Sequence, residues 1–109
     1  EILNNNNGIL FTEYSDNHSY FLFQVIFNKY IDRDKVLIGL KENGIGVSIH
    51  YATPVPLMSY YKNKYGYKDK DFPNAVHYGN QSISLPVHAK LTESDIEYIC
   101  QTLLKVMEN

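Results

Sequence analysis

The chain has 109 residues with a net charge of -2, one cysteine, ten tyrosines and no tryptophan. This length supports one domain with a modest core and is too short for two. The weak charge gives no reason to expect nucleic acid or an anionic membrane as a partner, and the apolar runs are far shorter than a bilayer span. The single cysteine excludes an internal disulfide and suits a reducing compartment, so we expect a cytoplasmic location. The first residue is Glu1 rather than methionine, so we expect a piece of a longer protein, and the start shows no positively charged, cleavable leader.

Two predicted strands flank a helix in the first half of the chain. Residues 1–17 are expected to form a loop or an inter-domain connection, because four asparagines and a glycine fall near their start. Residues 18–27 are almost continuously apolar, rich in aromatic and β-branched side chains, and predict a buried strand. Asp32 can cap a helix that starts at the next residue, and Gly44 stops it. The alternation in residues 45–50 predicts a second strand, which such a unit places parallel to the first.

Short helices, a third strand and a long helix are predicted in the second half. A short helix is expected after Pro56 and is ended by Gly66, and another opens at Pro73. Residues 82–87 predict a short strand, whose proline confines it to a strand end or a sheet edge. The last helix is expected just after Thr92, because the sequence TESD is a capping-box pattern and apolar residues then recur every three or four positions.

These elements predict an α/β (α+β) fold, a two-layer sandwich in which a small mixed or antiparallel sheet carries helices on one face. The three strands are expected to share one sheet. The helices that start at Arg33 and Glu93 each carry one apolar stripe, and these stripes need a common partner. Both helices are therefore expected on the same face of the sheet.

The candidate functional site is the end of the predicted strand 45–50. His50 and Tyr51 leave the sheet there on a loop that Pro54 and Pro56 restrict. Polar side chains on a restricted loop are a common way to present functional groups. The alternation of the strand turns His50 away from its apolar face. On the pattern alone, a turn whose histidine and tyrosine merely cap the sheet edge is favoured over a binding site, so both interpretations stay open.

Few other residues offer chemistry. His18 and His77 are expected to be structural, and no two histidines have the spacing of a zinc site, so no metal is expected. Cys100 falls on the apolar stripe of the last helix and is expected to be a core residue rather than a nucleophile. Four lysines and two aspartates in residues 62–71 allow a phosphate-binding role, although a solvated loop is favoured. Six tyrosines between positions 51 and 78 suit a surface that covers a partner or ligand, with biased codon composition as the alternative explanation.

Five blocks of sequence resemble the carboxy-terminal part of the DegT/DnrJ-type (StrS-like) sugar-nucleotide aminotransferases. In order, these blocks are GIGVSIHYATPVPL, YYKNKYGYK, DFPNA, SISLPVH and LTESDI, and the resemblance runs from about His18 to the end of the chain. The second block is most similar to aminotransferases that act on UDP-linked 4-keto-6-deoxy amino sugars. The chain departs from the family at Val76 and His77, where a glutamate is common.

The resemblance implies a pyridoxal-phosphate (PLP) enzyme that transfers an amino group, from glutamate, to a keto sugar nucleotide in surface-polysaccharide or glycan biosynthesis. It implies that residues 18–109 are the C-terminal small domain of a fold-type I PLP aminotransferase, with His50 and Tyr51 as substrate-binding residues. The full-length protein is then expected to be a homodimer. In the family, the catalytic lysine and the cofactor-binding residues precede this region. The chain alone is therefore expected to hold no catalytic residue, to bind no PLP, to be inactive, and to need the N-terminal large domain as its partner.

An alternative of a different class stays open. A free-standing two-layer α/β module can bind a protein or a small ligand through its Tyr-rich loop, for interaction or regulation. The upstream reading frame separates the two hypotheses. A lysine on a loop after a predicted strand, within roughly 250 preceding residues, indicates the enzyme. A start codon just before Glu1 indicates the module.

Overall fold

The computed structural model describes residues 2–108 and contains an antiparallel sheet with the strand order β1-β2-β3. The strands are β1 (Ile9–Leu10), β2 (Phe23–Phe27) and β3 (Ser82–Leu85). The helices are α1 (Arg33–Glu42), α2 (Ser59–Tyr65), α3 (Pro73–Gln81) and α4 (Glu93–Met107), with short 3-10 helices η1 (Val55–Leu57) and η2 (Asp69–Asp71). None of the helices in the described residues combines the length and the apolar character that a membrane crossing requires.

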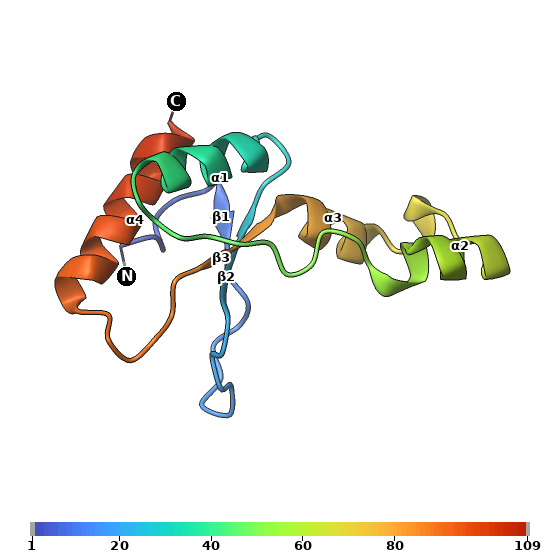
Figure 1. The fold of residues 1–109 in the computed structure, drawn as a ribbon, viewed down its shortest axis with the longest axis horizontal. Coiled ribbons are helices and arrows are strands. Elements are labelled where there is room, and N and C mark those ends of the chain that lie inside the picture. Colours follow the sequence, from blue (N-terminus) through green and yellow to red (C-terminus); the bar gives the residue numbers. More distant parts are fainter. Residues whose placement is uncertain (1, 109) are drawn as a thin grey trace.

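Helices α1 and α4 lie side by side on one face of the sheet (Figure 1). The core consists of alternate residues of β2 and β3 together with the inward side chains of both helices, namely Val25, Phe27, Ile83, Leu85, Val36, Leu40, Ile99 and Leu103. Gly39 of α1 allows a close approach between the helices, since a Cβ there would lie 3.0 Å from Cγ1 of Val106 in α4. The predicted two-layer fold, with both long helices on one face, is confirmed.

Both long helices begin where their capping residues predict. The Asp32 carboxylate accepts hydrogen bonds from the backbone N–H groups of Asp34 and Lys35, each at 3.1 Å. At the start of α4, the hydroxyl oxygen of Thr92 accepts from the N–H of Asp95 at 3.2 Å, and the Asp95 carboxylate accepts from the N–H of Thr92 at 2.8 Å. These bonds satisfy N–H groups that a helix start leaves without partners.

The strand predicted over residues 18–27 is shorter than expected, because only Phe23–Phe27 forms β2. Its partner sets this limit. Phe23 already pairs with Leu85, the last residue of β3, so residues 18–22 have no neighbouring strand. Tyr20 instead has a positive φ of 49°. His18, which was expected to begin a buried strand, is exposed to solvent.

Residues 45–50 form a single bridge rather than the predicted strand. Ser48 and Ser84 exchange backbone hydrogen bonds of 3.3 and 2.8 Å in an antiparallel bridge. The N–H of Ile45 still donates to the carbonyl of Leu40 in α1, so the chain is only leaving the helix at that point. Because β3 is antiparallel both to β2 and to this segment, residues 45–50 run parallel to β2, as expected, with β3 between them.

A short strand lies within residues 1–17, where a loop or connection was expected. Ile9 of β1 pairs with Phe27 of β2, and the side chains of Leu3 and Ile9 are buried. Two strand residues are too few to show a period in the sequence, so the asparagines around them dominated the prediction.

The segment from η1 to η2, residues 55–71, forms an arm that extends away from the sheet (Figure 1). Gly66 ends α2 with a φ of 70°, as predicted, although the helix begins at Ser59 rather than directly after the proline. Every residue of α2 is exposed, and Lys62 lies 3.6 Å from the Asp69 carboxylate. The charged stretch is therefore a solvated surface of the arm.

Candidate functional site

The face of the sheet opposite α1 and α4 carries polar side chains. Gln24 alternates with the core residues of β2, as Ser82 and Ser84 do in β3, and the register pairs Gln24 with Ser84. The bridge between Ser48 and Ser84 brings His50 to the same face. We call these five residues the polar sheet face.

His50 is half-buried and is held at two points. Its ring nitrogen Nδ1 lies 2.9 Å from the hydroxyl oxygen of Ser84 and 3.4 Å from that of Ser48. Its backbone carbonyl accepts a hydrogen bond of 2.6 Å from Nε2 of Gln24. The amide oxygen of Gln24 accepts in turn from the hydroxyl of Tyr78 in α3. Within residues 2–108 these bonds leave Nε2 of the His50 ring without a partner, so that nitrogen is open to a ligand.

Tyr51 stands next to His50 and is 73% exposed. The two rings meet edge to face, with centroids 5.3 Å apart and planes at 90°, and the peptide bond between the residues is cis. The structure thus brings together the two residues that the sequence indicates as the site. One of them is held by hydrogen bonds, and the other faces solvent.

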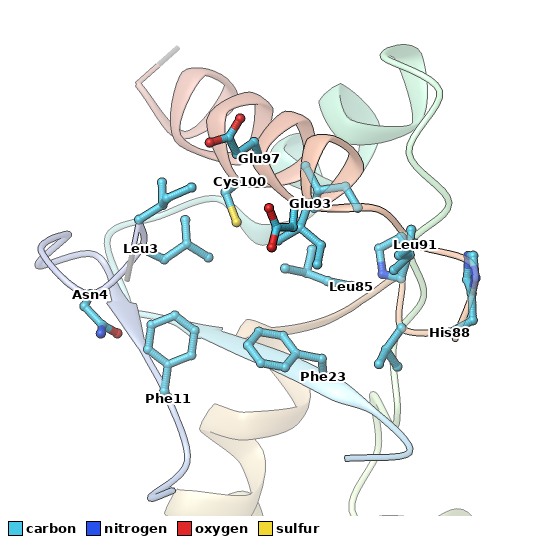
Figure 2. A pocket seen from close by; sticks show the side chains of 15 residues that line it. Leu3, Asn4, Phe11, Phe23, Leu85, His88, Leu91, Glu93, Glu97 and Cys100 are labelled. Atoms are coloured by element: carbon cyan, nitrogen blue, oxygen red, sulfur yellow. The ribbon is translucent and has the colours of Figure 1, made fainter.

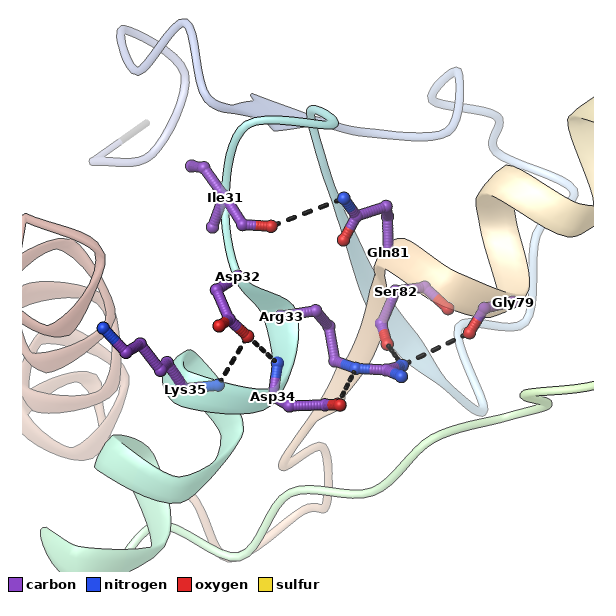
Figure 3. Close-up of polar contacts among 8 residues, drawn as sticks. All are labelled: Ile31, Asp32, Arg33, Asp34, Lys35, Gly79, Gln81 and Ser82. Atoms are coloured by element: carbon purple, nitrogen blue, oxygen red, sulfur yellow. Dashed lines mark hydrogen bonds and ion pairs between the residues drawn. The ribbon is translucent and has the colours of Figure 1, made fainter.

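The loop that carries these side chains rests on the end of α3. Gly79 is buried, and a Cβ there would overlap the backbone carbonyl of Ala52 and lie 3.1 Å from the carbonyl oxygen of Tyr51. The first residue of α1, Arg33, fixes this end of α3, because its Nη1 donates to the carbonyl oxygens of Gly79 and Ser82, each at 3.2 Å (Figure 3). The position of the site loop therefore depends on α1 and α3 together.

Burial raises the pKa of the Tyr78 hydroxyl above its ordinary value of 10.0. A tyrosine in that state keeps its proton at neutral pH, so it stays a donor to Gln24. The link from Tyr78 through Gln24 to the His50 carbonyl is therefore intact under ordinary conditions.

A separate groove of about 680 Å³ lies between α4 and the sheet (Figure 2). Its lining is mostly apolar, with the rings of Phe11 and Phe23 on one side and the carboxylates of Glu93 and Glu97 from α4 on the other. Cys100 also lines it, and burial raises the pKa of its thiol. A raised pKa makes a poor nucleophile at neutral pH, in keeping with the structural role expected for this cysteine.

The lysines of the chain do not fit a PLP site. A Schiff-base lysine needs an enclosed pocket that lowers its pKa, whereas every lysine of this chain is exposed. Among residues 2–108 there is also no group of three or more side chains that could hold a metal ion. His88 is exposed and His77 lies half-buried on α3, and neither contacts the ring of His50 by a hydrogen bond in this part of the chain.

Comparison with known proteins decides the family, because residues 2–104 match the model of the DegT/DnrJ/EryC1/StrS aminotransferase family. The chain belongs to this aminotransferase family. One curated relative is the spore coat polysaccharide biosynthesis protein SpsC of Bacillus subtilis. It is 32% identical to this chain over 79 residues, which are 72% of this chain and 20% of SpsC. The chain spans about a fifth to a quarter of the length of the curated relatives that it matches.

Solved structures agree with this aminotransferase assignment. The putative sugar aminotransferase Spr1654 from Streptococcus pneumoniae, in its PMP form, matches with a TM-score of 0.83 and 26% identity, over 98% of this chain and 27% of that one. Helicobacter pylori PseC, an aminotransferase involved in the biosynthesis of pseudoaminic acid, matches in fold with a TM-score of 0.85 and 22% identity, over 98% of this chain and 29% of that one.

The residues that support His50 were not predicted from the sequence. Ser84 and Gln24 lie 34 and 26 positions from His50, and Tyr78 reaches the site only through the packing of α3. One signal was present, because serines alternate with apolar residues in SISL and so mark a polar face opposite the core. Nothing in the local sequence marks Gln24 or Tyr78.

Proposed function

We propose that the chain is the C-terminal small domain of a PLP-dependent aminotransferase. The enzyme would transfer an amino group, from glutamate, to a keto sugar nucleotide in surface-polysaccharide or glycan biosynthesis. Family membership and the match to about a quarter of each relative support this proposal, as do the sugar-aminotransferase and polysaccharide descriptions of Spr1654 and SpsC. In this proposal residues 18–109 form the domain, and residues 1–17 form the connection, which adds β1 to the sheet.

The remaining parts of the proposal concern the missing partner. Because no lysine here lies in an enclosed pocket, the N-terminal large domain would supply the cofactor-binding lysine and the other contacts to PLP. We also propose that the full-length protein is a homodimer in the cytoplasm, where the single cysteine of this chain stays reduced.

His50 and Tyr51 are the proposed substrate-binding residues, and the open Nε2 of His50 is the observation that carries this assignment. An imidazole nitrogen can hydrogen-bond to a sugar hydroxyl or to a diphosphate oxygen. The exposed Tyr51 ring beside it offers an apolar face and a hydroxyl to the same ligand. The hydrogen bonds to Ser84 and Gln24 hold His50 in place before a ligand arrives, which lowers the ordering cost of binding.

The test is His50→Ala in the full-length enzyme. Loss of one hydrogen bond to a charged group costs about 1.5–3 kcal/mol, so we expect KM for the sugar nucleotide to rise about 10- to 150-fold. The cofactor absorbance should stay unchanged, and the unfolding temperature should fall only slightly, because the buried Ser84 hydroxyl loses its acceptor. His18→Ala, which removes an exposed histidine away from the polar sheet face, is the matched control and should leave KM unaltered. An unaltered KM in His50→Ala, or a large loss of stability instead, would refute the substrate-binding role.

The exposed tyrosines of the arm are the one observation that favours the free-standing interaction module. Tyr60 and Tyr65 are 65% and 56% exposed, on a helix without a buried residue. Such a module requires that the gene encode little beyond these residues, whereas the enzyme requires a large domain upstream. The open reading frame before Glu1 therefore separates the two functions directly.

A further inference from the structure

Among residues 2–108, the hydroxyl proton of Ser84 has one acceptor within reach, Nδ1 of His50. Ser84 is only 4% exposed, and buried hydroxyl groups in proteins are almost always hydrogen-bonded. In the described part of the chain, the contact of its oxygen is with Nδ1 of His50 at 2.9 Å. The hydroxyl oxygen of Ser48 is the second one near this nitrogen, at 3.4 Å. Because Ser48 is exposed, its hydroxyl can donate to water instead.

We propose that Ser84 is a positioning residue that holds the neutral His50 ring in the tautomer with its proton on Nε2. When the Ser84 hydroxyl donates to Nδ1, this nitrogen accepts and carries no proton, so the ring proton lies on Nε2. In the opposite arrangement Nδ1–H would donate to the serine oxygen. The buried hydroxyl proton of Ser84 would then have no acceptor, which is the unfavourable outcome for a group removed from water.

The main chain of His50 is anchored separately from its ring. The backbone carbonyl of His50 is bound by Gln24, whose amide oxygen accepts from Tyr78, so the residue is fixed at its main chain as well as at its ring. The amide of Gln24 is itself oriented by these two bonds, since its nitrogen donates and its oxygen accepts. Because Nδ1 is the ring nitrogen that contacts Ser84, Nε2 is the ring nitrogen left without a hydrogen-bond partner among residues 2–108.

A proton on Nε2 determines which ligand groups His50 can bind. The ring then donates, so its partner is an acceptor oxygen, such as a sugar hydroxyl oxygen or a phosphoryl oxygen, and an ammonium group is excluded. This consequence rests on the proposed function, in which a sugar nucleotide lies against His50. It assigns His50 to acceptor oxygens of that substrate, in its sugar or diphosphate part, and excludes an amino group as the partner of Nε2.

The tautomer can be measured without a substrate. In the 109-residue chain labelled with ¹⁵N at histidine, the Nε2–H tautomer gives Nδ1 a pyridine-type shift and Nε2 a pyrrole-type shift, and His50→Ala assigns the signals. We expect this pattern for His50 at a pH where its ring is neutral, and in Ser84→Ala a shift toward the average of both tautomers. Ser82→Ala is the matched control, because Ser82 is buried in the same strand and its hydroxyl has no hydrogen-bond partner among the described residues.

The wild-type spectrum alone can overturn the proposal, so it does not depend on the variants folding. A pyrrole-type Nδ1 shift in the wild type refutes the proposal. A His50 signal that Ser84→Ala leaves unchanged, or that Ser82→Ala alters equally, also refutes it.

Kinetics of the full-length enzyme provide a second test. Ser84→Ala should raise KM for the sugar nucleotide about 2- to 10-fold, as expected for the loss of one neutral hydrogen bond. In the His50→Ala background, Ser84→Ala should raise KM no further. An additive rise in the double variant also contradicts the proposal. If the spectrum shows Nε2–H but His50→Ala leaves KM unaltered, the positioning by Ser84 stands and the proposed substrate-binding role of His50 fails.

Discussion

Gly79→Ala tests whether the end of α3 positions the loop that carries His50 and Tyr51. The substitution adds one methyl group at the point where α3 touches the carbonyl groups of that loop. Two effects oppose each other. Alanine is about 1 kcal/mol more favourable than glycine within a helix. The added Cβ, however, would overlap the carbonyl of Ala52, 3.0 Å from its carbon, and lie 3.1 Å from the oxygen of Tyr51.

The steric effect should prevail, because the atoms in the way belong to the backbone and cannot rotate aside. Overpacking of this kind typically costs about 1–3 kcal/mol, and subtraction of the helix gain leaves a net loss of about 1 kcal/mol. The loop must also shift away from α3. Because the His50 carbonyl is held by Gln24 at 2.6 Å, a shift of the following residues strains or breaks this bond.

Urea unfolding followed by circular dichroism measures the stability change, and the amide NMR signals of Tyr51 and Ala52 report the movement of the loop. Gly46→Ala is the matched control, since Gly46 does not need a positive φ and a Cβ there meets no atom within 4 Å. The control should be neutral, or more stable by about 0.5 kcal/mol through its unfolded state. If Gly79→Ala is at least as stable as the wild type and the two amide signals do not move, α3 does not position the loop.

Two further predictions concern the cofactor and the start of α4. When the chain is mixed with PLP and reduced with borohydride, mass spectrometry should find no stoichiometric adduct at a single lysine, because all of its lysines are exposed. A stoichiometric single-site adduct would contradict this prediction. Hydrogen bonds from the side chain and backbone of Thr92 lower the pKa of Asp95 below its ordinary value of 3.8. The charged carboxylate therefore stabilises the fold above about pH 4, and this stabilisation is lost as the pH falls through the lowered pKa. In thermal unfolding at pH 7, the wild type should thus be more stable than Asp95→Asn, and this difference in stability should shrink in strong acid. A difference that does not depend on pH would show that the carboxylate charge plays no part.

Helix starts and stops were predictable because local contacts set them. Asp32 and Thr92 accept hydrogen bonds from N–H groups no more than three residues away. Gly66 has a left-handed backbone conformation that residues with a Cβ rarely adopt. Such signals need no knowledge of the tertiary fold. The apolar stripe of α4 likewise indicated its place against the sheet, although Ile96 on that stripe is 48% exposed at the groove.

Strand lengths and the contacts of His50 were not predictable in the same way. β3 runs only from Ser82 to Leu85 and so limits β2, and residues 45–50 meet β3 in a single bridge. Local apolar patterns cannot report the length of a distant partner. For the same reason the loop with His50 could be identified in the sequence, whereas its hydrogen bonds to Ser84 and Gln24 depend on the completed sheet.

The late position of β3 in the chain has a consequence for synthesis on the ribosome. β3 lies between β2 and the bridge at Ser48, and it follows both of them in the sequence. Until Ser82–Leu85 has left the exit tunnel, Val25 and Phe27 of β2 face water without their main partner, and α4, which covers them, is made later still. Long-range pairing of this kind folds slowly and leaves apolar strands open to aggregation or to chaperones in the meantime. Residues 2–108 can therefore complete their core only after α4 has been synthesised.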